Sequence, residues 1–143
     1  MTTTPKVVTK YASLVEAPAA NIWGIVTSWG SERLWMPGCT SSTLEGFGIG
    51  SVRDLAFSTR PGVTTRETLE AVNATEYTLR FRVYISTAGD ALQFGNIKLE
   101  PLNDKQTRVI WTGESSLDDE DLKETLDNMY EGFNHAISDL LKA

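Results

Sequence analysis

The chain has 143 residues, of which 41% are hydrophobic and 22% charged. This length and composition predict one soluble domain, residues 1–143, long enough to bury a core or to enclose a small cavity. Nineteen acidic residues outnumber thirteen basic ones, and the formal net charge of −6 argues against a nucleic-acid-binding protein, which needs a basic surface. The single cysteine, Cys39, excludes an internal disulfide and any multi-cysteine metal site.

No apolar run approaches the roughly 20 residues that a membrane-spanning helix needs, and the first residues lack the apolar core of a signal peptide. We therefore expect a cytoplasmic protein that uses no membrane, metal or cofactor and acts as a monomer or a homodimer. The acidity is concentrated in one segment: eight acidic residues and one lysine lie between Glu114 and Glu131. That segment has a local charge of −7, which leaves the rest of the chain near +1.

The first predicted elements are a strand over residues 6–17 and a helix over residues 19–26. The strand-forming residues end at Pro18, whose missing N–H suits the first turn of a helix, and apolar side chains then recur at helical spacing. Gly30 ends this helix, and a short helical turn is expected over residues 31–35. Six further strands are predicted over residues 41–45, 51–59, 63–72, 77–85, 91–101 and 106–117.

The clearest of these strands is 77–85, in which apolar and polar side chains alternate. A period of two with one apolar face indicates an antiparallel sheet that is covered on one side only. The last segment changes to helical spacing, and five of its apolar residues fall within about 60° of Leu122 on a helical wheel. These residues are Leu126, Met129, Phe133, Ile137 and Leu140. A long amphipathic helix, capped at its start by Ser116, is therefore predicted to cover the sheet in an α+β fold.

Four segments carry a family resemblance: WMPG at 35–38, EGFGIGSVRDL at 45–55, TRETL at 65–69 and TRVIW at 107–111. Together with the order of elements, they resemble the polyketide cyclase/dehydrase branch of the START-like (SRPBCC) superfamily, whose relatives include the birch-pollen allergen group and the plant abscisic-acid receptors. The resemblance implies a helix-grip fold, in which a curved seven-stranded antiparallel sheet wraps around the long C-terminal helix and one or two short helices follow the first strand. It also implies an apolar ligand cavity between them.

The gating loops of the hormone receptors are not matched in this chain. Their Ser-Gly-Leu-Pro-Ala loop is replaced by the turn at 58–62, and their His-Arg-Leu turn is replaced by residues 90–92. The resemblance therefore does not imply hormone reception.

Arg53 and Glu67 are the polar candidates for chemistry. Arg53 shares strand parity with Leu55, and Glu67 shares it with Leu69, so both charges are predicted to face the cavity. A turn centred near Pro61 would place Leu55 opposite Glu67, with Arg53 one diagonal step away. Two interpretations stay open: an ion pair that fixes the strand register, or a catalytic pair whose carboxyl group is tuned for proton transfer by desolvation.

Apolar and aromatic side chains are predicted to surround this pair, either as core packing or as a wall for a flat ligand. The predicted ligand-binding residues are Trp35, Phe57, Leu69, Phe81, Trp111, Met129, Tyr130 and Phe133. Tyr130 flanks the apolar stripe of the final helix, where it is either a boundary residue or a source of a hydroxyl at the cavity mouth. His135 falls on the solvent side of the same helix.

Two functions from different classes fit these features. One is an enzyme that binds a hydrophobic, aromatic or polyketide-like small molecule and catalyses its cyclisation, dehydration or isomerisation without a cofactor. In it, Arg53 would stabilise an enolate-like oxygen while Glu67 moves a proton. The alternative is a non-catalytic carrier or sensor of an apolar small molecule, in which the same pair anchors the polar end of the ligand. A third interpretation is a partner-binding module that uses the acidic residues 118–131.

Overall fold

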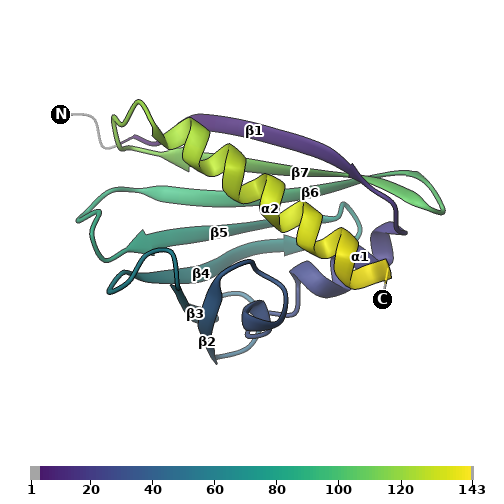
Figure 1. Ribbon diagram of the computed structural model, residues 1–143, viewed down its shortest axis with the longest axis horizontal. Helices are drawn as coiled ribbons and strands as arrows, with labels where there is room; N and C mark the ends of the chain where they lie inside the picture. Colours follow the sequence, from purple (N-terminus) through teal and green to yellow (C-terminus); the bar gives the residue numbers. More distant parts are fainter. Residues whose placement is uncertain (1–3, 143) are drawn as a thin grey trace.

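The computed structural model describes residues 4–142, which form a seven-stranded antiparallel sheet and three helical segments (Figure 1). The helical segments are α1 (Ala19–Val26), the 3-10 helix η1 (Glu32–Leu34) and α2 (Leu122–Lys142). The strands are β1 (Lys6–Val15), β2 (Cys39–Glu45), β3 (Val52–Phe57), β4 (Thr64–Asn73), β5 (Thr78–Ile85), β6 (Gln93–Asn103) and β7 (Gln106–Ser115). The predicted α+β architecture is confirmed.

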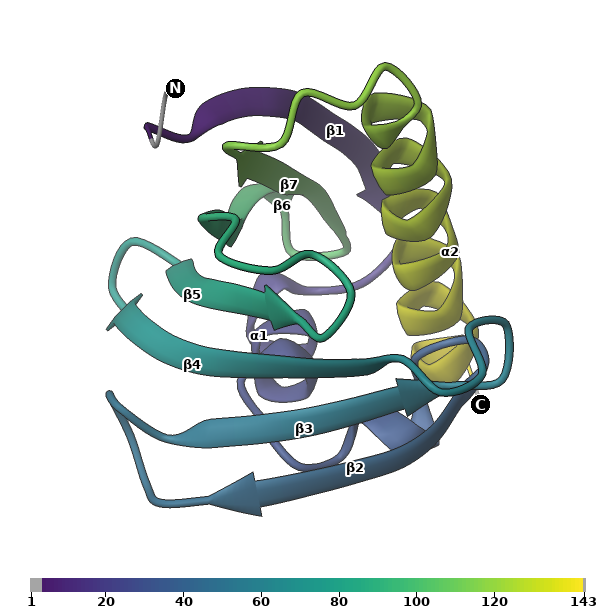
Figure 2. The ribbon, with the colours of Figure 1, turned by 90° about the vertical axis from the view of Figure 1, so that its left-hand side faces the viewer.

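The sheet curves around α2, and its strand order is β1-β7-β6-β5-β4-β3-β2. Figure 2 shows this curvature, with α2 along one side of the concave face and α1 at its far end. The first and last strands are neighbours, whereas the connection through α1 and η1 carries the chain to β2 at the opposite edge. This arrangement is the helix-grip fold that the family resemblance implies. None of the helices in residues 4–142 is both long and apolar enough to cross a membrane.

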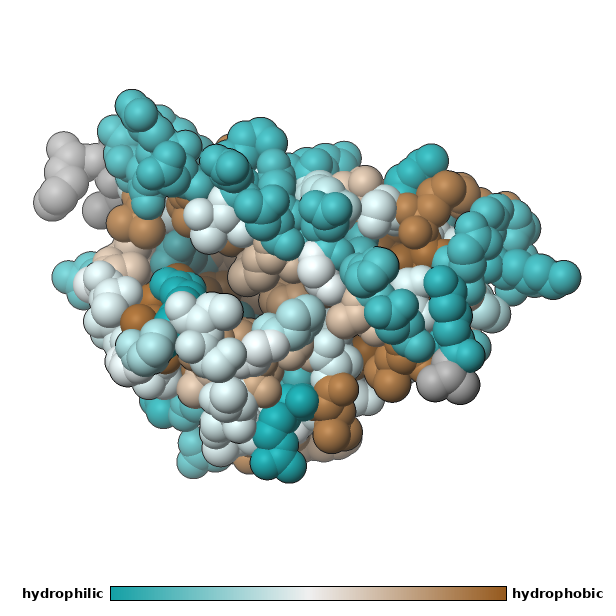
Figure 3. Space-filling view, in the orientation of Figure 1, coloured by the Kyte–Doolittle hydropathy of each residue, from teal (hydrophilic) through white to brown (hydrophobic). Residues whose placement is uncertain are grey.

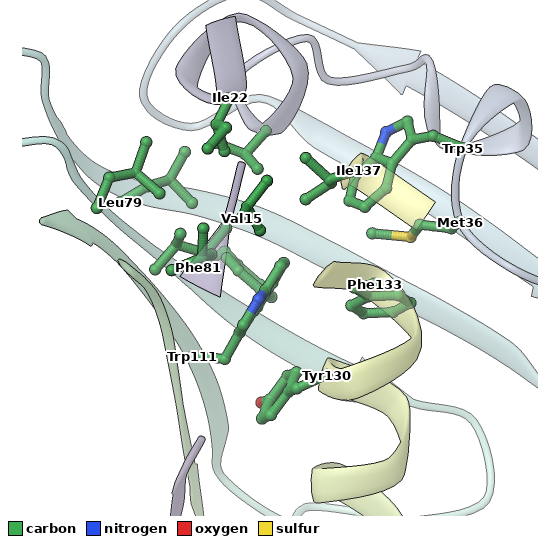
Figure 4. Close-up of a cluster of buried hydrophobic side chains, with 14 of the residues drawn as sticks. Val15, Ile22, Trp35, Met36, Leu79, Phe81, Trp111, Tyr130, Phe133 and Ile137 are labelled. Atoms are coloured by element: carbon green, nitrogen blue, oxygen red, sulfur yellow. The ribbon is translucent and has the colours of Figure 1, made fainter. Parts of the chain in front are cut away.

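The core lies between the concave face of the sheet and the two α-helices. Side chains from β1, β5, β6 and β7 meet side chains from α1 and α2, and Figure 4 shows this cluster in close-up. Its most deeply buried members include Ile22 on α1, Trp111 on β7 and Ile137 on α2, each with at most 1% of its surface exposed. The concave face is therefore filled by side chains at the end where α1 lies.

The buried face of α2 is rotated relative to the predicted apolar stripe. Tyr130 and Asn134, which lie to one side of that stripe, are both buried. Met129 and Leu140, which the wheel places near its centre, expose 37% and 43% of their surface. The rotation follows from packing against β1 and β7. The side of α2 that contacts these strands is buried, even where it does not coincide with the centre of the apolar stripe.

The start of α2 also differs from the prediction. The helix begins at Leu122, so Ser116 lies six residues before it and is not its cap. The Ser116 hydroxyl oxygen accepts a hydrogen bond from the backbone N–H of Leu92 (2.8 Å) and so ties β7 to the loop before β6. The backbone N–H of Leu122 donates to the carbonyl oxygen of Asp119 (3.2 Å), so the acidic residues immediately precede the first helical turn.

Two glycines on the inner face allow aromatic rings to lie against the sheet. Gly95 on β6 pairs with Gly113 on β7. A Cβ atom on Gly95 would lie 2.3 Å from a ring carbon of Phe81, and one on Gly113 would lie 2.9 Å from the hydroxyl oxygen of Tyr130. These are approaches that only glycine permits, so the two rings occupy the space that side chains at these positions would fill.

Candidate functional site

One row of paired residues crosses the inner face of the sheet and carries most of its polar side chains. Arg53 on β3 pairs with Glu67 on β4, Glu67 with Val83 on β5, Val83 with Gln93 on β6, and Gln93 with Ser115 on β7. All four polar members are buried, while Val83 is half-buried. The structure therefore places Arg53 and Glu67 on the inner face, as predicted, but directly opposite each other and not on a diagonal.

The guanidinium group of Arg53 bridges two carboxylates. Its Nε donates to Oε1 of Glu67 (2.8 Å), and a terminal nitrogen lies 2.5 Å from the same oxygen. The other terminal nitrogen donates to Oε2 of Glu32 on η1 (2.7 Å). Glu32, with 1% of its surface exposed, also accepts hydrogen bonds from the backbone N–H of Gly30 at both carboxylate oxygens. With all three groups ionised, this buried cluster of Glu32, Arg53 and Glu67 has a net charge of −1.

The two carboxylates of this cluster are held differently. Glu32 is held by the backbone N–H of Gly30 as well as by Arg53. Both Arg53 contacts to Glu67 fall on Oε1, and Oε2 takes no part in them. Burial raises the pKa of Glu67 above its ordinary value of 4.5; Arg53 opposes this shift and the charge of Glu32 adds to it. Glu67 is therefore the member of the cluster best suited to exchange a proton with a ligand.

Aromatic rings enclose the guanidinium group of Arg53. Its central carbon lies 3.9 Å from the ring centre of Trp29 and 5.2 Å from that of Phe81, within the range of cation–π attraction. The two rings meet edge to face at 5.9 Å. Each of the three guanidinium nitrogens contacts a carboxylate oxygen, and the two rings lie against the group. Arg53 is therefore placed to orient Glu67 and does not present a free nitrogen to a ligand.

A second group of aromatic residues connects β7 to α2. Trp111 stacks on Tyr130 with ring centres 5.2 Å apart, and Phe133 packs against both Trp111 and Trp35 (Figure 4). The indole N–H of Trp111 donates to Oδ1 of Asn134 (2.6 Å), which fixes the tilt of the ring. Tyr130 is thus inside the core and not at its boundary, with its hydroxyl over Gly113. Burial raises the pKa of Tyr130, and the charges of Glu67 and Asp127 raise it further, so the hydroxyl stays protonated.

The interior opens at the end of the sheet that lies away from α1. Inward-facing Phe57 on β3, Val83 on β5 and Leu126 on α2 are only half-buried there, and Met129 is exposed. Figure 3 shows a recess beside α2 on the same face of the molecule. Leu69, by contrast, is buried beside Phe81, its partner across β4 and β5. The predicted ligand-binding residues therefore divide into a buried set and a set at this opening.

Other surface features lie apart from this site. One groove of about 510 Å³ runs between β1 and α2, and another of about 450 Å³ lies over β4, β5 and β6; neither is lined by Arg53 or Glu67. His135, on the exposed face of α2, lines the first groove. Burial raises the pKa of the Cys39 thiol, which disfavours the reactive thiolate. Among residues 4–142, no three His, Cys, Asp or Glu side chains are grouped so that they could hold a metal ion.

The sequence profile of the family described as polyketide cyclase/dehydrase and lipid transport matches residues 6–142. The chain belongs to this family. No curated protein matches the sequence.

Solved structures show the same fold at low sequence identity. An uncharacterised protein from Bacillus thuringiensis superposes with a TM-score of 0.77 at 20% identity, covering 94% of this chain and 98% of that one. Norcoclaurine synthase from Thalictrum flavum, in complex with dopamine and hydroxybenzaldehyde, gives a TM-score of 0.77 at 20% identity, covering 96% and 87%. A conserved protein from Geobacillus kaustophilus gives 0.74 at 14% identity, covering 93% of each chain. At these identities the likeness shows the fold.

Four residues of the site were missed by the sequence analysis. Glu32 lies in a three-residue helix, too short for any periodicity to assign it a face. Gln93 and Ser115 share strand parity with buried residues and could have been assigned to the inner face, but they are neutral and drew no attention beside Arg53 and Glu67. The burial of Asn134 could be predicted only from the actual rotation of α2, which the helical wheel did not give.

Proposed function

We propose that this chain binds a hydrophobic, aromatic or polyketide-like small molecule in its interior and catalyses the cyclisation, dehydration or isomerisation of that molecule without a cofactor. The observation that carries the proposal is the geometry of Glu67. This buried carboxyl group has a raised pKa, one oxygen held by Arg53 and the other outside that contact, on the inner face beside half-buried Val83. An oriented carboxyl group of this kind is what proton transfer to or from an apolar ligand requires.

The chemistry proceeds by proton transfer at carbon. Oε2 of Glu67 removes a proton from the carbon next to a ligand carbonyl; the electron pair of the broken C–H bond forms the enolate, whose charge moves to the carbonyl oxygen. Return of that proton to another atom gives isomerisation. Attack of the enolate carbon on a second carbonyl gives ring closure, and the alkoxide that forms takes up the proton from Glu67. Loss of a β-hydroxyl group, which leaves as water with the proton that Glu67 holds, gives dehydration. Arg53 acts as a positioning residue, which differs from the predicted direct contact with the enolate oxygen.

Tyr130 adds a hydrogen-bond donor on the helix side of the same space. Its raised pKa keeps the hydroxyl protonated, and one cause of that shift is the nearby charge of Glu67. A protonated hydroxyl can stabilise the developing charge on a ligand oxygen, an effect that is strongest where water is excluded. The stacked Trp111 and Tyr130 rings hold this donor in place.

A non-catalytic carrier is the second candidate, and one observation favours it. Arg53 has salt bridges on two sides, so its guanidinium group is already paired with the carboxylates of Glu32 and Glu67. In a carrier the cluster would fix the register of β3 against β4, while the apolar interior alone would retain the ligand.

The two candidates are separated by measuring binding and proton transfer on one probe, the benzo-fused ketone 2-tetralone. Quenching of tryptophan fluorescence reports binding, and proton NMR in D₂O reports exchange of the protons next to the carbonyl. We expect the wild type to accelerate exchange, and Glu67→Gln to bind the ketone but lose about 10²-fold or more of the rate. Glu70→Gln, the same change on the outer face of β4, is the matched control and should keep full activity. Full exchange activity in Glu67→Gln would refute the role of Glu67, and binding without exchange in the wild type would establish the carrier.

A further inference from the structure

The interior contains buried hydrogen-bond donors that the protein does not use. Among residues 4–142, three buried side-chain N–H groups have no hydrogen-bond partner: Nε1 of Trp29, Nε1 of Trp35 and Nε2 of Gln93. Most buried donors in proteins are paired, because burial without a partner is unfavourable, and each exception calls for an explanation. All three groups are donors, so what would satisfy them is a molecule that brings acceptors.

Gln93 is the best placed of the three. It lies on the inner face of β6 with 7% of its surface exposed, in the same row of paired residues as Glu67. The hydroxyl of Ser115 accepts a hydrogen bond from the backbone N–H of Leu117 (3.0 Å) and donates its own proton to Oε1 of Gln93 (3.3 Å). In this arrangement Oε1 of Gln93 has a hydrogen-bond partner and Nε2 is the end without one.

The positions of Gln93 and Glu67 define a span that a carbonyl group fits. Val83 alone separates them in the row, so their Cα atoms lie two strand spacings apart, about 9.6 Å. Val83 is half-buried at the opening of the interior and is smaller than Phe81, its inward neighbour on β5. A ligand there would accept a hydrogen bond of about 2.9 Å at one end and place a C–H bond about 3–3.5 Å from the carboxylate at the other.

We propose that Nε2 of Gln93 donates a hydrogen bond to a carbonyl oxygen of the ligand and thereby selects ketones over hydrocarbons of the same shape. The assignment rests on the proposed function for the location of the ligand. It names the substrate class more narrowly: an uncharged ketone or polycarbonyl compound whose carbonyl oxygen faces β6 and whose adjacent carbon faces Glu67 on β4. In that orientation Gln93 also stabilises the oxygen on which the enolate charge develops.

The test compares 2-tetralone with tetralin, which has the same ring skeleton and no carbonyl, in wild type and in Gln93→Met. Methionine has a similar length to glutamine and no donor. We expect the wild type to bind the ketone roughly five- to tenfold more tightly than the hydrocarbon, and Gln93→Met to reduce this preference to near unity. Gln106→Met, the same change at the half-buried start of β7, is the matched control and should keep the preference.

Infrared spectroscopy of 2-tetralone labelled with ¹³C at the carbonyl reports the hydrogen bond directly. Bound to wild type, the carbonyl band should lie at lower frequency than in a hydrocarbon solvent, and in Gln93→Met it should return toward the solvent value. An unshifted band in wild type would overturn the assignment even if Gln93→Met failed to fold, and so would an unchanged ketone preference in a folded Gln93→Met.

The outcome is separable from that of the proposed function. A shifted band and a Gln93-dependent preference without any proton exchange would leave the assignment standing and refute catalysis. Proton exchange that depends on Glu67, together with an unshifted carbonyl band, would support catalysis and refute the assignment of Gln93.

Discussion

Replacing Arg53 by Met tests whether the buried cluster of Glu32, Arg53 and Glu67 holds the fold together. The guanidinium group of Arg53, 2% exposed as a residue, makes three contacts of 2.5–2.8 Å with two buried carboxylates. Removing one partner of a buried ion pair typically costs about 3–5 kcal/mol, because the remaining charge has lost both water and its counter-charge. For a chain of this length, about 4 °C per kcal/mol gives a fall in the thermal midpoint of about 12–20 °C.

The stability lost in Arg53→Met should increase as the pH rises. Without Arg53, nothing opposes the desolvation that raises the pKa of Glu67, so the folded state binds protons more tightly than the unfolded chain. Stability is then greatest below the ordinary value of 4.5 and is lost as pH rises through the raised value. Unfolding followed by circular dichroism at pH 5 and pH 8 should therefore show the larger deficit at pH 8.

A surface pair provides the control for this experiment. Arg66 on β4 makes two hydrogen bonds to Asp54 on β3, but this pair is exposed and screened by solvent, so Arg66→Met should change the midpoint little. Adding Glu67→Gln to Arg53→Met should restore part of the lost stability, since it removes one of two uncompensated charges. A deficit in Arg53→Met no larger than that of Arg66→Met, or equal at the two pH values, would refute the electrostatic argument.

Three further predictions concern Glu67 and two glycines. Because burial raises the pKa of Glu67, wild type should lose stability as pH rises from 4.5 through the raised value, and Glu67→Gln should flatten this part of a plot of urea midpoint against pH. Gly24→Ala should stabilise the protein by about 0.5–1 kcal/mol in urea unfolding, since Gly24 is helical and a Cβ there meets no atom within 4 Å. Gly95→Ala should destabilise it by about 1–3 kcal/mol, because its Cβ would overlap the ring of Phe81; an unchanged midpoint would mean that the ring moves freely.

Strand parity predicted the faces of the sheet better than it predicted the register. Arg53 and Glu67 were both assigned to the inner face, and they lie there. The predicted partner of Glu67 was Leu55, whereas the structure pairs Leu55 with Thr65 and Arg53 with Glu67. The difference arises at the turn, because moving its centre by one residue shifts the pairing by two residues and leaves every side chain on its own face. A wrong turn centre therefore leaves the predicted face of each residue correct but changes which two residues are paired.

Local patterns could not predict contacts that depend on packing. The wheel for α2 weights apolar residues equally, so it could not show that Asn134 is buried to accept the indole N–H of Trp111. Glu32 is buried because the 3-10 helix η1 lies beside β2, which brings its carboxylate under Arg53. Nothing within three residues of Glu32 marks it as different from an exposed acid. The place of Glu32 in the cluster therefore depends on the tertiary fold and not on the local sequence.

The net charge of −6 and the charge at the site have different physical causes. Asp118 to Asp121 precede α2 at the positive end of its dipole, are exposed, and are screened beyond about 8–10 Å at physiological ionic strength. They contribute most of the net charge and almost none of the field at Glu67. Inside, two carboxylates share one guanidinium group, so the protonation of Glu67 is decided by its own burial and by Arg53 and Glu32. A variant that neutralised Asp118 to Asp121 should therefore shift the isoelectric point without moving the pH profile of any activity that depends on Glu67.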